Sequence, residues 1–501
     1  MTAAQLSLHK LPESWAWTRI GDIAETVTGT TPSKKDPNNY GDFIPFVKPP
    51  ELDDSIIDSA YDNLSEKGAK LARILPPESV LVSCIGILGK TGINKMRVAF
   101  NQQINAVIFP NGIVPRFGFY YFQTLEAREW LNKISSATTV TIVNKSKFDT
   151  TPFPVAPTNE QHRIVSRVEE LFTILDAGVE SLKKVKAQLK RYRQAVLKYA
   201  FEGKLTEEWR KTQEHQMEPA TRLLEQIRQE LQQKWNLEKK GRYQQPLLSD
   251  IKSLPKLPPG WCWASVDELS IVVRGASPRP AGDPRLFGGN IPWITVGPLT
   301  ADEQPYLRNV HETVTEAGRN VSRYVEPDTL LLTNSGATLG VPKITLVGGC
   351  INDGVVALLH ADYPLKLYLY YFLKSQTRRL RYINQGAAQP NLNTGIVKAI
   401  QVPVPPSEEQ EQIVSKIESL FTKANSAEMS VVRGIRISES LKQAVLAKAF
   451  RGELVPKDPI DEPADKLLER IREERTKSKG EKDTDKKKSN PKQLELSTYV
   501  K

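Results

Sequence analysis

The sequence predicts an α+β protein that is a pseudo-two-fold internal repeat: two mixed α/β, β-rich domains separated by two long antiparallel coiled-coil helices. The first observation behind this is a duplication. The segment LPESWAWTRIGDI at 11–23 returns as LPPGWCWASVDEL at 257–269, and PTNEQHRIVSRVEELF at 157–172 returns as PSEEQEQIVSKIESLF at 406–421. Two similar units in one chain can approximate a two-fold dimer while differing in detail.

The second observation is that each repeat opens with a segment of β character. Short apolar runs, such as 78–87, 105–110 and 328–334, alternate with Gly, Pro and Asn, which favour turns. Aromatic and more helical patches follow at 117–134 and 366–383. Each segment then ends in proline-rich chain that prevents a helix from starting early. We therefore expect two mixed domains in which strands dominate.

The third observation is a long run of helical periodicity after each domain. Apolar residues recur every three or four positions, which keeps one seam along a helix. Thr158 and Ser407 are suitable N-caps, and a helix over 158–200 would be about 65 Å long. We expect the two helices to pair antiparallel, and the alternative is that each packs on its own domain. The predicted seam consists of Ile164, Val168, Leu171, Leu175, Leu182, Leu189, Ile413, Ile417, Leu420, Leu441 and Val445.

These patterns divide the chain into seven expected segments. They are a first β-rich domain (1–157), a central spacer helix (158–200), a connector with a short amphipathic helix (201–256), a second β-rich domain (257–406), a distal spacer helix (407–450), a short C-terminal helix (451–478) and a basic disordered tail (479–501).

Charge and cysteine usage restrict the possible partners and location. The chain has a formal net charge of +11 and a pI near 9.2, which suits a polyanionic partner, although a basic protein without an acidic ligand fits the charge equally well. The three scattered cysteines are typical of reduced thiols rather than of a disulfide frame or a zinc site. Neither a signal peptide nor an apolar run of membrane-spanning length is evident, so we expect a cytoplasmic protein.

Catalytic motifs are absent on close inspection. Gly89, Lys90 and Thr91 resemble the end of a phosphate-binding loop, but Cys84 occupies the position of its first glycine and a strand, not a helix, is expected to follow. A turn in a small β domain explains this segment better. We therefore expect no catalytic residue, no metal site and no cofactor in this chain.

What remains is recognition by polar loops. Asn and Gln can pair with adenine, and Arg or Lys with guanine, although surface loops are polar in any protein. Between the two repeats the tryptophans, glycines, prolines and helix seams are kept, whereas the polar loop residues differ. This is what two readers of different half-sites would show. The candidate DNA-contacting residues are Thr30, Thr31, Ser33, Lys34, Lys35, Lys90, Asn94, Lys95, Gln102, Thr138, Thr139, Asn144, Lys145, Lys147, Arg274, Ser277, Arg279, Arg285, Asn334, Ser335, Thr338, Gln385, Gln389, Asn391 and Asn393.

In the order and duplication of these motifs the chain resembles the specificity (S) subunits of type I restriction–modification enzymes. The resemblance rests on LPESWAW and LPPGWCW, on Gly29 with Pro32 and Gly275 with Pro278, on the proline-rich exits into EQHRIV and EQEQIV, and on QAVLKYAFEGKL and QAVLAKAFRGEL. It implies two target-recognition domains that bind the halves of a split double-stranded DNA site, held apart by the long helices.

The resemblance also implies partners and cofactors. Two methylation subunits would bring S-adenosylmethionine, and restriction subunits would bring ATP- and Mg-dependent translocation and cleavage, so that the chain itself is not an enzyme. The alternative is a coiled-coil scaffold whose globular domains bind proteins rather than DNA. A self-contained nuclease would need a metal or phosphate site that the sequence does not offer.

Overall fold

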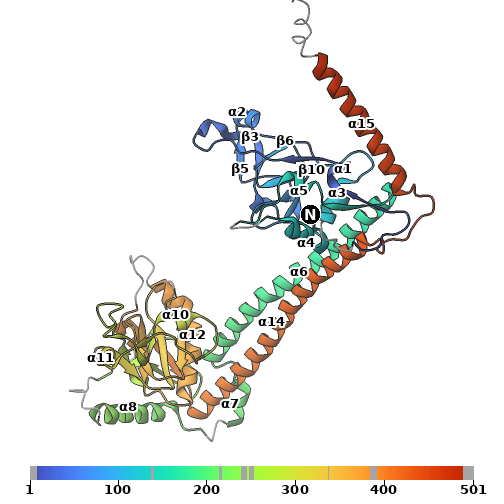
Figure 1. The fold of residues 1–501 in the computed structure, drawn as a ribbon. Helices are drawn as coiled ribbons and strands as arrows, with labels where there is room; N and C mark the ends of the chain where they lie inside the picture. The colour runs from blue at the N-terminus through green and yellow to red at the C-terminus, as the bar shows by residue number, and fades with distance from the viewer. Residues whose placement is uncertain are drawn as a thin grey trace, which may run out of the picture. The chain divides into compact units, whose positions relative to one another are not determined.

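The chain folds into two compact units. The computed structural model describes residues 8–136, 140–213, 217–237, 245–246, 253–336, 338–383 and 392–488. One unit, unit 1, comprises residues 1–182 and 432–501, and the other, unit 2, comprises residues 183–431. Each contains one β-rich domain and one half of each long helix (Figure 1). The predicted α+β fold with a duplicated, mixed domain is thereby confirmed.

Unit 1 contains a five-stranded sheet, a four-stranded sheet and a two-stranded sheet. Their strand orders are β2-β10-β7-β8-β4, β5-β3-β9-β6 and β1-β11. Only the β4–β8 and β3–β9 pairs are parallel among the described strands of this unit. The strands are β1 (Ala16–Arg19), β2 (Glu25–Thr28), β3 (Tyr40–Val47), β4 (Ser55–Ile57), β5 (Asp62–Leu64), β6 (Ile74–Leu75), β7 (Val80–Ser83), β8 (Thr91–Asn94), β9 (Val98–Phe100), β10 (Ile104–Ile108) and β11 (Pro152–Val155).

An aromatic core joins the helices of unit 1 to its sheets. Phe117 packs against Trp15, Phe153 and Phe450 with ring centroids 4.9–6.0 Å apart. The predicted helical patch 117–134 is two helices, because Thr124 caps a new helix by accepting a hydrogen bond from Ala127 N. Besides the long helices, the helical segments of this unit are α1 (Ile20–Ile23), η1 (Pro37–Asn39), η2 (Pro49–Glu51), α2 (Glu66–Leu71), α3 (Pro115–Phe122), α4 (Leu125–Ile134), α5 (Lys145–Phe148) and α15 (Ala464–Lys488).

Unit 2 repeats the same sheet topology. Its sheets have the orders β13-β21-β18-β19-β15, β16-β14-β20-β17 and β12-β22, so each sheet of unit 1 has a counterpart. The strands are β12 (Cys262–Ser265), β13 (Ile271–Arg274), β14 (Phe287–Ile294), β15 (Tyr306–Leu307), β16 (Thr313–Val314), β17 (Arg323–Val325), β18 (Thr329–Thr333), β19 (Pro342–Thr345), β20 (Gly349–Ile351), β21 (Val355–Leu359) and β22 (Gln401–Val404). The helices are α7 (Glu207–Gln213), α8 (Ala220–Leu237), α9 (Val266–Leu269), α10 (Val296–Thr300), α11 (Glu316–Asn320), α12 (Leu365–Ile383) and α13 (Thr394–Lys398).

Two long helices, α6 (Thr158–Phe201) and α14 (Ser407–Phe450), contribute to both units. In unit 1, Lys442 Nζ lies 2.6 Å from Asp176 Oδ1, and a Cβ added to Gly434 would lie 2.9 Å from Leu182 Cδ1. In unit 2, Arg193 contacts Glu428 at 2.8 Å. In these contacts, residues later in α6 lie beside residues earlier in α14. The helices therefore run antiparallel, as predicted.

The predicted seam residues are buried or half-buried except at one position. Ile164, Val168, Ile413 and Ile417 are buried within the cores of the two units, and the other predicted seam residues apart from Leu441 are half-buried. Leu441 is 47% exposed, however, and Leu446 is the buried leucine. Leu446 lies in the core that contains Phe117 and Tyr121, so the domain of unit 1 decides which face of α14 is buried there. The prediction for Leu441 is wrong for this reason.

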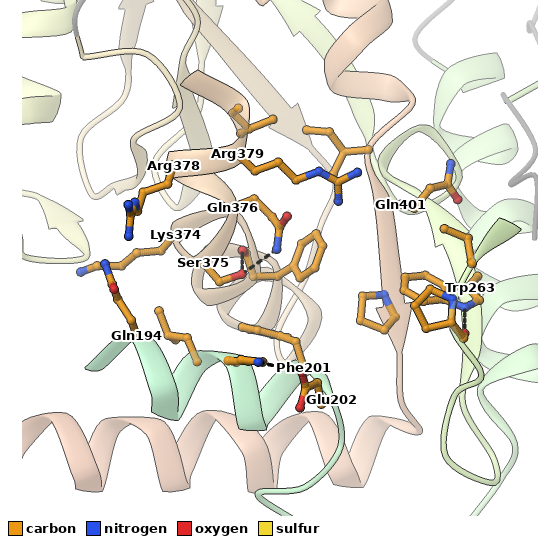
Figure 2. A pocket seen from close by; sticks show the side chains of 18 of the residues that line it. Gln194, Phe201, Glu202, Trp263, Lys374, Ser375, Gln376, Arg378, Arg379 and Gln401 are labelled. Atoms are coloured by element: carbon orange, nitrogen blue, oxygen red, sulfur yellow. Dashed lines mark hydrogen bonds and ion pairs between the residues drawn. The ribbon is translucent and has the colours of Figure 1, made fainter. Parts of the chain in front are cut away.

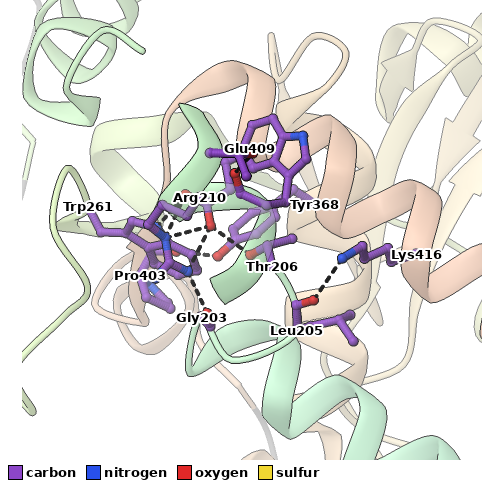
Figure 3. Close-up of polar contacts among 11 residues, drawn as sticks. Gly203, Leu205, Thr206, Arg210, Trp261, Tyr368, Pro403, Glu409 and Lys416 are labelled. Carbon is purple, nitrogen blue, oxygen red and sulfur yellow. Dashed lines mark hydrogen bonds and ion pairs between the residues drawn. The ribbon is translucent and has the colours of Figure 1, made fainter. Parts of the chain in front are cut away.

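A buried polar cluster ties α14 to the domain of unit 2. Glu409 accepts hydrogen bonds from Trp261 Nε1 (2.8 Å), Arg210 Nε (2.9 Å) and Thr206 Oγ1 (2.6 Å). Figure 3 shows these contacts converging on the carboxylate, with Arg210 also reaching the carbonyl of Gly203 at 2.5 Å. Because every group in the cluster is buried and paired, it fixes where α14 begins relative to the end of α6 within this unit.

The connecting segments also repeat. Ala220 N at the start of α8 donates to Gly260 O, and Ala464 N at the start of α15 donates to Ser14 O, both at 2.9 Å. The helix α15 runs to Lys488, so it takes up residues 479–488, which the sequence analysis assigned to a disordered tail. Lys and Glu have good helix propensity, which explains the extension. Residues 489–501 of that tail lie outside the described part of the chain.

Candidate nucleic-acid interface

Four loops of unit 1 meet at one end of its five-stranded sheet. The loop after β2 is held by Gly29 N and Thr30 N, which donate to Ile104 O (3.1 Å) and Phe100 O (3.0 Å). The β9–β10 turn meets the β7–β8 loop through Cys84 N and Gln103 O (2.8 Å), and residues 141–143 join through Val143 N and Cys84 O (2.9 Å). Segments far apart in sequence thus form one edge, which we call the loop edge of unit 1: residues 29–35, 84–90, 101–103 and 140–143.

Unit 2 has the same edge, built by the same contacts. Gly275 N donates to Val355 O (2.9 Å) and Ala276 N to Ile351 O (3.1 Å). Asn334 N donates to Gly354 O (3.0 Å), and Leu392 N to Asn334 O (2.7 Å). The loop edge of unit 2 comprises residues 274–279, 334–341 and 352–354, except residue 337, which lies outside the described residues, and Leu392 flanks it.

One glycine in each unit permits this convergence. A Cβ added to Gly29 would lie 2.0 Å from the carbonyl oxygen of Asn101, and a Cβ added to Gly275 would lie 2.0 Å from that of Asn352. No other residue fits such a close backbone approach. This explains why both repeats carry glycine at the entry to the first loop.

Several predicted residues are brought together and exposed at the loop edge of unit 1. Ser33, Lys34, Lys35 and Gln102 are exposed, and Thr31 donates a hydrogen bond to Gln102 across the two loops. Lys90 and Lys147 are half-buried, and Lys147 Nζ donates to Ser136 Oγ at 2.6 Å. These side chains supply cationic donors and amide groups of the kinds that contact phosphates and bases.

At the loop edge of unit 2 the polar groups are organised by Asp353. This residue was not singled out from the sequence. Its backbone carbonyl accepts from Arg274 Nε at 2.9 Å, its carboxylate accepts from Ser277 Oγ at 2.7 Å, and Arg279 lies 3.5 Å from it. Asp353 thus orients Arg274 through its backbone carbonyl, and Ser277 and Arg279 through its carboxylate, as a supporting residue does in a recognition site. Its only signal in the sequence was the Asn-Asp-Gly turn 352–354.

Other predicted residues have structural roles. Asn94 is buried and bonds to the chain around Ser79 and Met96 at the opposite end of the β7–β8 hairpin, where Lys95 also lies. Asn334 is 0% exposed. The prediction that Asn94 and Asn334 reach a base is wrong because both side chains are buried. Asn94 satisfies local backbone groups, whereas the side-chain oxygen and nitrogen of Asn334 have no hydrogen-bond partner among the described residues.

Four further candidates are already engaged locally. Asn144 and Asn393 are the N-caps of α5 and α13, accepting from Lys147 N (3.0 Å) and Ile396 N (2.9 Å). Lys145 pairs with Asp149 at 2.8 Å and Arg285 with Asp283 at 2.6 Å. The two asparagines occupy equivalent positions in the repeat because each caps a short helix. Ser335 and Thr338 are half-buried within the edge. The candidates Thr138, Thr139, Gln385, Gln389 and Asn391 lie outside the described residues.

The electrostatics of the described residues do not favour nucleophilic or metal chemistry. Burial raises the pKa of the Cys84 thiol to about 12 and that of Cys262 to about 11, so both are protonated at neutral pH. Within the described ranges no group of three His, Cys, Asp or Glu side chains could hold a metal ion. The segment around Lys90 is a turn between β7 and β8, as predicted, and not a phosphate-binding loop.

A cavity of about 860 Å³ lies elsewhere in unit 2, beside the C-terminal end of α6. Leu197, Phe201 and Phe372 contribute apolar surface to it. Figure 2 shows Lys374 and Arg378 on one side of the cavity and Trp263 and Gln401 on the other. Burial lowers the pKa of the Lys374 ammonium. Ser375 Oγ donates to Phe372 O at 2.6 Å, so this hydroxyl is bonded to the preceding turn inside α12.

Among the residues that the structure describes, no helix combines the length and hydropathy required of a membrane span.

Comparisons with known proteins agree with this architecture. The family described as type I restriction modification DNA specificity domain matches residues 12–191 and 260–429. The EcoKI specificity subunit of Escherichia coli K12 is 25% identical over 96% of this chain and 100% of its own length. The EcoDI specificity subunit of Escherichia coli is 26% identical over 96% of this chain and 100% of its own length.

Solved structures share the fold. The HsdS subunit from Thermoanaerobacter tengcongensis has a TM-score of 0.51 at 18% identity and covers 89% of this chain and 99% of its own. A chain described under "complex assembly and conformational transition of the type I R-M system" has a TM-score of 0.61 at 19% identity, covering 89% of this chain and 100% of its own. The two matched segments together span most of this chain, and it therefore belongs to the family of type I restriction–modification DNA specificity subunits.

Proposed function

We propose that this chain is the sequence-reading subunit of a type I restriction–modification complex, with one loop edge for each half of a split double-stranded DNA site. The observation that carries the proposal is the pair of loop edges, which have the same backbone contacts but different side chains. A shared frame gives both units the same way of approaching a duplex, and different side chains give them different bases to read.

The chemistry of the edges suits this role. Cations such as Lys34 and Arg279 would neutralise phosphates, which sets register and makes affinity fall with salt. A good bidentate base contact adds about 1–3 kcal/mol of discrimination. When two such readers share one chain, the second engagement becomes intramolecular and their selectivities multiply.

The catalytic steps would belong to partner subunits. Methylation subunits, two of them in the family's pattern, would supply S-adenosylmethionine, and restriction subunits would supply the ATP- and Mg-dependent steps. In this proposal the chain contributes recognition and a scaffold, with no reaction of its own.

Domain exchange tests the proposal. Replacing residues 11–157 with the corresponding segment of another specificity subunit should change one half-site and leave the other intact, as read by methylome sequencing of a host that carries the complete system. A change in both halves would contradict independent reading by the two units.

The alternative is a scaffold whose domains bind proteins. Binding to random-sequence duplex DNA over a salt series separates the two functions. Recognition of DNA predicts a linear fall of log K with log salt, with a slope of about −0.9 per phosphate contacted. If the chain assembled with its methylation subunit did not bind duplex DNA even at low salt, the protein-binding scaffold would be favoured.

A further inference from the structure

A short β-ribbon stands in the loop edge of unit 1. Ile85 and Ile142 form an antiparallel bridge, flanked by hydrogen bonds from Gly86 N to Thr141 O and from Val143 N to Cys84 O, both 2.9 Å. Ile142 also exchanges backbone hydrogen bonds of 2.9 and 3.1 Å with Ser136 on its other side. Ile142 is therefore the central residue of a small ribbon.

The ribbon carries apolar side chains that are not covered. Ile87 is 70% exposed, Val140 is 50% exposed and Ile142 is 40% exposed. Ile87 and Val140 each lie two residues from the Ile85–Ile142 bridge, in the directions that place them beside one another if the ribbon register continues. Single exposed apolar residues are ordinary, but three grouped on one ribbon indicate a contact surface.

The backbone under Ile87 is fixed. Ser83 Oγ donates to Ile87 O at 2.6 Å and accepts from Lys90 N at 2.9 Å, while Gly89 N donates to Ser83 O at 3.0 Å. Leu88, the next residue, is buried and anchors the loop. Ile87 therefore projects from a held loop, and little ordering is needed when a partner contacts it.

The surroundings of the ribbon favour a duplex over an apolar protein partner. Lys90 ends the loop, Lys147 contacts Ser136 of the ribbon, and Gln102 belongs to the turn that bonds to Cys84. Cations and amides around a narrow apolar ribbon match the major groove, which admits a two-stranded β-ribbon and presents the thymine methyl group among its acceptors and donors.

Unit 2 has an equivalent loop that is one residue longer. Thr333 Oγ1 donates to Thr338 O (2.7 Å) and accepts from Val341 N (2.9 Å), whereas Ser83 makes the same contacts with Ile87 and Lys90. Gly86 and Gly336 have positive φ values of 79° and 75°. Thr338 therefore makes the backbone contact of Ile87, but its side chain is half-buried, and residue 337, which follows Gly336, lies outside the described residues.

From these observations we infer that the apolar ribbon of unit 1, with Ile87 at its tip, reads thymine through its 5-methyl group in the major groove of one half-site. The inference rests on the proposed function. It assigns thymine reading to the half-site bound by unit 1.

The test is removal of the methyl group from the DNA. For the full chain assembled with its methylation subunit, target duplexes are made with deoxyuridine at single thymine positions, and dissociation constants are measured by fluorescence anisotropy. Wild type should bind at least one such duplex about fourfold more weakly, the effect of one methyl group lost from an apolar contact. Ile87→Ser, which leaves no methyl group on the side chain, should bind the thymine and uracil duplexes equally.

Met96→Ser is the matched control. Met96 is 40% exposed in the same unit, but it lies beyond the opposite end of the β7–β8 hairpin, so this variant should keep the fourfold preference. Equal binding of thymine and uracil duplexes by wild type, or a target half-site without thymine, would overturn the inference. If instead the assembled wild-type complex shows no sequence preference at all, the proposed function fails rather than this inference.

Discussion

Glu160 and Glu409 occupy equivalent positions near the start of the two long helices, but their charges are compensated differently. Glu409 meets Trp261, Thr206 and the guanidinium of Arg210. Glu160 accepts from Trp15 Nε1 at 3.0 Å, and its Oε1 has no partner among the described residues. Both copies have the tryptophan–carboxylate pair, and among the described residues only the carboxylate of unit 2 has a hydrogen-bonded arginine.

Neutralising the two glutamates should therefore have opposite effects. Glu409→Gln leaves Arg210 buried without its charge partner, and we expect unit 2 to lose about 3–5 kcal/mol of stability. Glu160→Gln removes a charge that burial disfavours more than its neighbours favour it, so unit 1 should be at least as stable as in wild type at pH 7. Hydrogen exchange of peptides covering 11–23 and 257–269 over a urea series measures each unit separately. Equal losses in both units would contradict the asymmetry.

Glu160 also makes the stability of unit 1 depend on pH. Burial raises the pKa of the Glu160 carboxyl in the folded chain, so the folded state holds its proton more tightly than the unfolded state does, whose value is about 4.3. The stabilisation is present below that value and is lost as pH rises through the raised pKa. Protection of peptides from 11–23, corrected for intrinsic exchange, should fall across this window in wild type and stay level in Glu160→Gln. If protection fell equally with pH in wild type and in Glu160→Gln, the pH dependence would belong to another titratable group.

The glycines at the loop edges support a second prediction at this scale. Gly275→Ala places a methyl group 2.0 Å from Asn352 O, so the first loop must move away from the β20–β21 turn. We expect loss of specific binding to one half-site with little change in non-specific affinity, measured by competition with mutated half-sites. Gly282→Ala is a control, because no atom lies within 4 Å of its added Cβ, although its φ of 76° carries some strain. An unaltered half-site preference in Gly275→Ala would mean that the loop does not read bases.

Among the elements, α14 shows how far periodicity predicts packing. Steps of three and four residues placed Ile413 and Ile417 correctly in the core, close to the fixed start of the helix at Glu409. The prediction failed at Leu441, about seven turns later, although Val445, one turn further on, is half-buried. Which leucine is buried there depends on the neighbouring domain, which supplies Phe117 and Tyr121 to the core containing Leu446.

This correction gives a direct prediction. Leu446→Ala should destabilise unit 1 by about 2–5 kcal/mol, because it removes a buried side chain, whereas Leu441→Ala should change stability by about 0.5 kcal/mol or less. Urea unfolding of the full chain compares two identical substitutions five residues apart on one helix. If both variants lost similar amounts of stability, Leu441 would belong to the buried seam after all.

The loop elements were predicted by composition and placed only by the fold. Thr31 and Gln102 are 71 residues apart yet hydrogen-bonded, and no local pattern signals such a pair. Conversely, Asn94 and Asn334 have the right chemistry for base contacts but are buried. The exposure of Ile87 was missed because an isoleucine after a strand predicts core, and only the positive φ of Gly86 directs it outward.

For the whole molecule, the central hypothesis is that α6 and α14 set the separation between half-sites. Removing seven residues from each helix keeps the two-turn periodicity and shortens each by about 10 Å. We expect the tolerated spacer to shorten by roughly three base pairs, at about 3.4 Å each. Mapping methylated sites of the variant system measures this, and an unchanged spacer would refute the hypothesis.

The duplicated plan, the dominance of strands, the long helices and the family could be predicted from the sequence, because repeats and hydrophobic periods are local patterns that can be counted along a chain. The folded arrangement was needed to show which polar residues share an edge, which are buried, and that Ile87 is exposed on a held loop. Those properties depend on backbone contacts between distant strands and on the conformation of single glycines, and neither leaves a periodic trace in the sequence.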